Sequence, residues 1–183
     1  HGQSLGLAIT GIQDIVIFKS DKEGRAAAAV KGADIIFSGA GLPLNLPSFL
    51  KADSTTKLAP IVSSARALKV ICRRWIGEYS YVPDAVVVEG PKAGGHLGYS
   101  HEQLNDPAYS LETIVPEVVE AAREIGEKHN KHIPVIAGGG IYTGEDIVKF
   151  MALGADAVQM GTRFVTTEEC DASDDFKQSY LDA

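Results

Sequence analysis

The sequence predicts an α/β fold with a parallel sheet, and within that class it favours a (β/α)₈ TIM barrel that is incomplete in this chain. Apolar runs typical of buried strands alternate with amphipathic helical patterns, giving about six βα units. No change of composition marks a linker, so residues 1–183 are expected to form one domain. Nearly every predicted strand is followed by a chemically distinctive turn, which suits a barrel whose βα loops meet at one mouth.

An open doubly wound sheet shows the same alternation and is the alternative fold. Such a sheet would concentrate its functional turns at a single switch point rather than after each strand. A complete barrel has eight strands and typically about 250 residues, whereas this chain has 183. The chain also lacks an initiator Met. We therefore expect a partial barrel that lacks two N-terminal strands and begins part-way through its parent protein.

The individual elements follow from short apolar runs and from capping residues. The predicted strands are residues 7–10, 33–38, 58–62, 84–88, 133–137 and 155–160. Residues 15–18 are predicted to be either an extended segment or a first helical turn. The predicted helices are 21–31, a helix from Ser63 or Ser64 to about Tyr79, 111–128, 144–153 and a final helix cut short at Ala183. Two of these helices begin with capping boxes, at Ser20 with Glu23 and at Thr143 with Asp146.

Composition narrows the class of function. The formal net charge of −7 argues against a nucleic-acid or anionic-membrane surface, either of which calls for a basic patch. Two cysteines are too few for a disulfide framework, and neither has the spacing of a metal ligand. No signal peptide and no membrane-spanning apolar run is recognisable. We expect a cytoplasmic protein that binds a small molecule and no metal; its oligomeric state is left open, with a homodimer as one option.

Two neighbouring strand ends carry glycine-bearing turns. Gly138, Gly139 and Gly140 follow the strand 133–137, and Gly161 and Thr162 follow the next strand. Such turns let backbone N–H groups approach an anion, and the last two loops of a barrel commonly hold a phosphate. The turns are therefore predicted to form half of a phosphate cradle. The alternative is that the first glycine run merely permits tight packing.

Gln159 directly precedes the second glycine turn. Its amide could donate to a ligand carbonyl, although a residue that points into a barrel can also be polar for packing reasons.

His96 is the sharpest candidate for chemistry. It lies in the segment EGPKAGGHLG, on the loop after the strand 84–88, with Gly94 and Gly95 directly before it. Glycines beside a histidine let a flat ligand approach the backbone and leave the imidazole accessible. An imidazole titrates near neutral pH and can take or give a proton during turnover. The alternative is a surface or structural histidine.

Other strand ends offer supporting residues. Ser38, Gly39 and Ala40 provide a floor of small residues after the strand 33–38. Glu89 and Lys92 flank the histidine loop, and either can be a solvated charge, with Lys92 the stronger case.

Four motifs together resemble one known family. They are FSGAGLP (37–43), VVEGPKAGGHLG (87–98), PVIAGGGI (134–141) and GADAVQMGTRF (154–164). In this order they resemble the nitronate monooxygenase family, also called 2-nitropropane dioxygenase-like, whose members are FMN-binding TIM barrels. The flavin-dependent enoyl-ACP reductases share the pattern and the fold.

The resemblance implies roles for particular residues. His96 corresponds to the catalytic histidine of the family. Gly138 and Leu97 are small departures from the usual motifs, and an asparagine that contacts FMN in the family has no match here. The implied cofactor-binding residues are Gly94, Gly95, Gly139, Gly140, Gln159, Gly161 and Thr162.

The implied reaction is FMN-dependent oxidation of nitronates or nitroalkanes by O₂, with His96 as general base or acid, giving a carbonyl compound and nitrite. Three other functions stay open at this point. The first is an FMN- and NAD(P)H-dependent enoyl-ACP reductase. The second is a flavin-free barrel that isomerises or condenses sugar phosphates in the same cradle. The third is a truncated barrel without catalytic activity.

Overall fold

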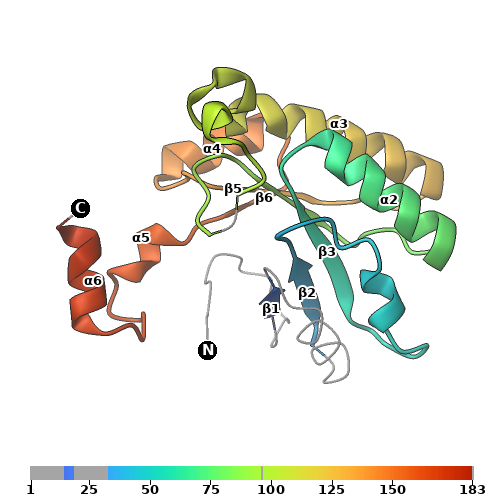
Figure 1. The fold of residues 1–183 in the computed structure, drawn as a ribbon, viewed down its shortest axis with the longest axis horizontal. Helices are drawn as coiled ribbons and strands as arrows, with labels where there is room; N and C mark the ends of the chain where they lie inside the picture. Colours follow the sequence, from blue (N-terminus) through green and yellow to red (C-terminus); the bar gives the residue numbers. More distant parts are fainter. Residues whose placement is uncertain (1–14, 19–32, 96, 183) are drawn as a thin grey trace.

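The fold is a single parallel sheet flanked by helices, as seen in a computed structural model that describes residues 15–18, 33–95 and 97–182 (Figure 1). The six strands of the described residues lie in the sheet in the same order as in the sequence, and every pairing is parallel. They are β1 (Ile15–Phe18), β2 (Ile35–Ser38), β3 (Lys57–Val62), β4 (Val86–Glu89), β5 (Val135–Gly138) and β6 (Ala157–Gln159).

This order is that of a barrel, because the order in a doubly wound sheet reverses at a switch point. The predicted partial barrel is confirmed. The predicted strand 7–10 and helix 21–31 lie outside the described residues.

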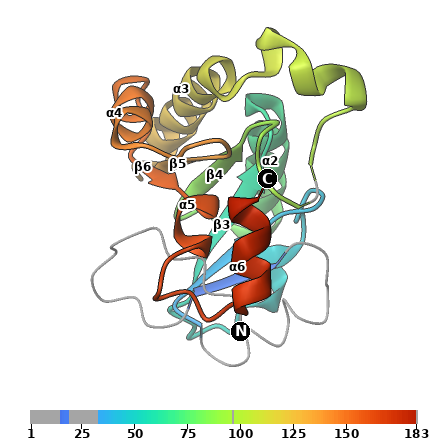
Figure 2. The same ribbon diagram turned by 90° about the vertical axis from the view of Figure 1, so that its left-hand side faces the viewer.

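Three long helices cover one side of this sheet (Figures 1 and 2). They are α2 (Ala65–Tyr79), α3 (Leu111–His129) and α4 (Gly144–Ala152). The short helix α5 (Thr162–Val165) and the helix α6 (Asp174–Leu181) follow β6 and lie away from them. Within the described part of the chain, three 3₁₀ helices occupy the loops, namely η1 (Leu46–Phe49), η2 (His101–Asn105) and η3 (Pro107–Tyr109).

The helices begin and end where the sequence supplies caps. Ser64, not Ser63, caps α2, and its side chain accepts a hydrogen bond from the N–H of Ala67. The capping box of Thr143 and Asp146 opens α4 as predicted. Gly154 follows α4 with φ of 99°, a left-handed conformation that glycine adopts without strain.

Two apolar layers follow from the alternation of side chains along each strand. One layer packs between the sheet and the helices, where Trp75 of α2 is fully buried and its indole N–H donates to the carbonyl of Pro43. The opposite face of the sheet, which is the inner side of the barrel, forms the second cluster from Ile35, Phe37, Ala59, Ile61, Ala85, Val87 and Ile136. By the same alternation, Glu89, Gly138 and Gln159 belong to the inner side.

A polar network joins the amino-terminal ends of the strands. The Asp84 carboxylate accepts hydrogen bonds from the N–H of Leu58, the hydroxyl of Tyr81 and the ammonium of Lys131. Its side chain is only 14% exposed. Burial, followed by the hydrogen bond to Asp84, raises the pKa of Tyr81, so the phenol keeps its proton. The network links three segments at the edge of the sheet opposite the glycine turns.

The helices of the described residues include none that is long and apolar enough to cross a membrane.

Candidate functional site

The carboxyl ends of β4, β5 and β6 bring the predicted site residues to one edge of the sheet. Glu89 pairs with Gly138 across β4 and β5, and Gly138 pairs with Gln159 across β5 and β6. The turns that follow these strands therefore start from adjacent positions. The side chain of Gln159 is partly exposed on the inner side of the barrel.

The Gly139–Gly140 turn is packed against the loop that carries the histidine. Both glycines have positive φ, at 102° and 76°. A Cβ at Gly139 would lie 2.8 Å from the backbone nitrogen of Ala93, and one at Gly140 would lie 2.9 Å from Cδ of Lys92. Gly139 is therefore required both by its conformation and by its close contact with the Ala93 backbone, and Gly140 by its conformation. Lys92 is exposed, as expected, although its aliphatic stem covers Gly140.

The second turn is open. A Cβ at Gly161 would meet no atom within 4 Å. The N–H groups of Gly140, Gly161 and Thr162 donate to no acceptor among the described residues. Unused donors at adjacent strand ends, with open space beside Gly161, fit the terminal group of an anionic ligand. The two predicted glycine turns are thus adjacent, and the second leaves room for such a group.

The histidine loop is described on both sides of His96, which itself lies outside the described residues. The loop starts with a turn in which the N–H of Ala93 donates to the carbonyl of Gly90. Gly94 and Gly95 are exposed, and Gly95 has φ of 84°. At the other end, Gly98 lies so close to β3 that a Cβ would be 2.5 Å from Oγ of Ser63.

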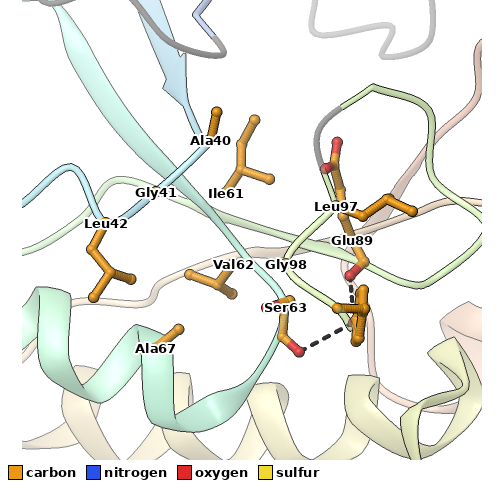
Figure 3. Close-up of a pocket in the computed structure, with 11 residues that line it drawn as sticks. Ala40, Gly41, Leu42, Ile61, Val62, Ser63, Ala67, Glu89, Leu97 and Gly98 are labelled. Carbon is orange, nitrogen blue, oxygen red and sulfur yellow. Dashed lines mark hydrogen bonds between the residues drawn. The ribbon is translucent and has the colours of Figure 1, made fainter. Parts of the chain in front are cut away.

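A cavity of about 270 Å³ lies between this loop, the end of β3 and the loop after β2 (Figure 3). Its lining is mostly apolar, and it includes the carboxyl end of β4 and the start of α2. The lining residues are Ala40, Gly41, Leu42, Ile61, Val62, Ser63, Ala67, Glu89, Leu97, Gly98 and Tyr99. Leu97 and Gly98 place the histidine loop in one wall of this cavity.

Two residues of the cavity, Glu89 and Tyr99, have surroundings that the sequence left open or did not indicate. Glu89 is 8% exposed rather than solvated, because β4 turns it to the inner side of the barrel. Sequence reasoning missed Tyr99, whose hydroxyl lies 2.8 Å from the carbonyl of Glu89 and 3.2 Å from that of Ser63. Burial and the charge of Glu89 raise the pKa of Tyr99 to about 12, so its hydroxyl remains a donor.

The small residues at and after the end of β2 differ in their surroundings. Ala40 lines the cavity and has φ of 54°, an uncommon value for a residue with a side chain. Ser38 lies two residues after Ile36 in β2, so its side chain is on the same face of the sheet, toward the helices. It is fully buried, and its hydroxyl has no hydrogen-bond partner among the described residues. The predicted floor of small residues therefore contributes Ala40, but not Ser38, to the cavity wall.

No group of three or more His, Cys, Asp or Glu side chains that could hold a metal ion occurs within residues 15–18, 33–95 and 97–182.

The fold and this edge of the sheet define a class, namely a partial βα barrel with two adjacent glycine turns next to a histidine loop. The sequence model of the nitronate monooxygenase family matches residues 11–183. The chain belongs to the nitronate monooxygenase family.

Individual relatives agree with this assignment. A protein described as "Probable nitronate monooxygenase" from Staphylococcus saprophyticus subsp. saprophyticus is 38% identical over 98 residues, which are 52% of this chain and 25% of that protein. The M276A mutant of FabK from Thermotoga maritima superposes with a TM-score of 0.69 at 30% identity, covering 92% of this chain and 49% of FabK.

Nitroalkane oxidase from Streptomyces ansochromogenes gives a TM-score of 0.63 at 28% identity over 85% of this chain and 41% of that enzyme. The matched regions thus make up a quarter of the curated relative and less than half of each of these solved structures.

Proposed function

We propose that residues 1–183 form one FMN-binding domain of a flavin-dependent oxidoreductase that oxidises nitronates or nitroalkanes with O₂. The observation that carries this proposal is the alignment of three consecutive strand ends. The register of β4, β5 and β6 sets the histidine loop beside two glycine turns with unused N–H donors. Membership of the nitronate monooxygenase family supports the same conclusion.

The residues at these strand ends suit the terminal phosphate of FMN. Gly140, Gly161 and Thr162 would hold it through their backbone N–H groups, and Gly139 would shape the first turn. Gln159, on the inner side next to Gly138, would meet a polar edge of the ring system. Gly94 and Gly95 would let the flat ring approach the histidine loop. When bound, FMN would supply the redox chemistry, because a flavin can take electrons from an organic substrate and pass them to O₂.

His96 would act as the general base. It would remove the proton α to the nitro group of a neutral nitroalkane. The cavity beside its loop is near the lower end of the usual size range for ligand sites, roughly 300–1,000 Å³, and its walls are mostly apolar. Those properties favour a small substrate with an alkyl group.

The first experiment is a visible absorption spectrum of the purified protein, followed by anaerobic mixing with a preformed alkyl nitronate. A flavin spectrum that bleaches with nitronate alone is the expected result. A colourless protein, and one that does not take up added FMN, would contradict the proposal.

A His96→Ala variant tests the proton-transfer role. Turnover of a neutral nitroalkane is expected to fall by roughly 10²–10⁴-fold, the usual contribution of a positioned general base. Oxidation of a preformed nitronate, which has already lost that proton, should fall much less, and the flavin should stay bound. His101→Ala in the exposed 3₁₀ helix η2 is the matched control. Full nitroalkane turnover in the His96 variant would rule out this role.

An FMN- and NAD(P)H-dependent enoyl-ACP reductase is the second candidate. The observation that favours it is the apolar rim of the cavity, where Leu42 and Leu97 are 48% and 36% exposed and could contact an acyl chain. Rapid anaerobic bleaching of the flavin by NADPH, with no response to nitronate, would support the reductase instead.

A further inference from the structure

We propose that Tyr99 is a positioning residue for His96, because it ties the end of the histidine loop to both β3 and β4. The inference rests on the catalytic role proposed above for His96, and it adds a residue that neither the motifs nor the comparisons assign. It follows from how the two ends of the loop are attached.

The start of the loop is fixed by β5. The N–H of Gly90 donates to the carbonyl of Gly138, and the next turn closes with the hydrogen bond from Ala93 to Gly90. Ala93 then lies in contact with Gly139, where no Cβ could fit without displacing one of them. The chain is therefore held up to Ala93.

The end of the loop is fixed by β3 and β4. The hydroxyl of Tyr99 lies within hydrogen-bond distance of two carbonyls, those of Ser63, directly after β3, and of Glu89, the last residue of β4 (dashed lines in Figure 3). Gly98 meets Ser63 in the contact that leaves no room for a Cβ. His96 follows the first attached end and precedes the second in the sequence.

The tyrosine is itself held. Its ring packs edge-on against Tyr109, with the ring centroids 6.2 Å apart and an interplanar angle of 80°. Because the ring is fixed, the hydroxyl can hold the loop end in one place relative to the two strands. A phenol with a raised pKa keeps the proton that it donates over the whole physiological pH range.

Tyr99→Phe removes this hydroxyl and keeps the ring. Misplacing a catalytic group by about 1 Å can cost 10²-fold in rate, so we expect kcat for a nitroalkane to fall on the order of 10-fold. KM and FMN content should change by less than about twofold. Tyr109→Phe is the matched control, since its hydroxyl makes no hydrogen bond to another described residue.

A second pair of variants keeps the test independent of the tyrosine. Gly98→Ala should lower kcat, because the new methyl group would collide with Ser63. Adding Ser63→Gly removes the colliding atoms and leaves the carbonyl that Tyr99 reaches, so the double variant should recover most of the lost rate. Failure of this recovery, or equal rates in the Phe variants at 99 and 109, would overturn the proposal.

Hydrogen exchange separates this inference from the proposed function. In the Tyr99→Phe protein the amides of residues 94–99 should exchange roughly fivefold faster, as expected for the loss of one hydrogen bond of about 1 kcal/mol. If the wild-type protein does not oxidise nitronates, the proposed function fails while faster exchange still supports the anchoring. Unchanged exchange in this segment overturns the anchoring, whatever the wild-type activity.

Discussion

Besides Tyr81, two acids among the described residues, Cys72 and the partly buried Tyr99, keep their protons far above neutral pH. Cys72 of α2 is 2% exposed in the apolar core, and burial raises the pKa of its thiol to about 12. Tyr99 reaches a similar value by burial and by the nearby charge of Glu89. Neither residue can lose its proton in the folded state at ordinary pH, so a thiolate role for Cys72 is excluded.

These raised pKa values predict that stability falls at alkaline pH. Above about pH 9 the unfolded chain loses the Cys72 proton, and above about pH 10 the Tyr99 proton, while the folded chain retains both up to about pH 12. The unfolded state then binds fewer protons, so the free energy of unfolding decreases as pH rises. The buried Cys72 thiol contributes at most about 1.4 kcal/mol per pH unit, and the half-exposed Tyr99 contributes less because solvent screens it.

Urea unfolding at pH 8 and pH 10.5 measures this effect. Cys72→Ala should flatten the pH dependence, although its own cavity lowers stability at both pH values. A free energy of unfolding that stays constant over this interval would contradict the burial of these groups.

At the scale of the elements, the two glycine turns differ in what they do. The Gly139–Gly140 turn holds the histidine loop in place and has a backbone conformation that disfavours side chains. The Gly161 turn has neither property, since its surroundings are open. The first turn therefore has a structural role in addition to its proposed contact with phosphate.

Alanine substitutions should separate these roles. Gly140→Ala is expected to lower the free energy of unfolding by about 1–2 kcal/mol, the cost of a left-handed residue with a side chain. Gly161→Ala should leave stability within about 0.5 kcal/mol and weaken FMN binding if the methyl group enters the phosphate site. Thermal or urea unfolding without cofactor, followed by FMN titration, measures both effects. Equal losses of stability in the Gly140→Ala and Gly161→Ala variants would contradict a structural role that belongs to the first turn alone.

Local sequence signals predicted the elements well, because their causes are local. The capping box at Thr143, the cap at Ser64 and the apolar runs define helices and strands without reference to the rest of the chain. Strand limits were less accurate, and β6 has three residues where six were predicted, since pairing with β5 decides its length.

The site was predictable only in part. Glycine turns and the histidine motif can be recognised in the sequence, and β-strand order then makes them neighbours. The burial of Glu89 and the contacts of Tyr99 depend on Ser63, which is distant in sequence. No local pattern could indicate those contacts.

For the molecule as a whole, the C-terminal helix contributes little to the core. α6 has no buried residue, and Phe176, Tyr180 and Leu181 are all at least 42% exposed. Removing residues 174–183 should therefore change the free energy of unfolding of this chain by less than about 1 kcal/mol. Urea unfolding of the truncated chain, compared with that of the intact chain, tests this expectation. A large loss would mean that α6 supports the sheet.

The agreement of strand order with chain order has a consequence for biosynthesis. Each strand from β2 to β6 pairs with the strand that precedes it in the sequence. During synthesis, its partner has therefore already left the ribosome when the new strand emerges. Assembly can proceed from the amino-terminal side without waiting for a distant partner. The edge that carries the histidine loop and the glycine turns would then be finished only when β6 emerges.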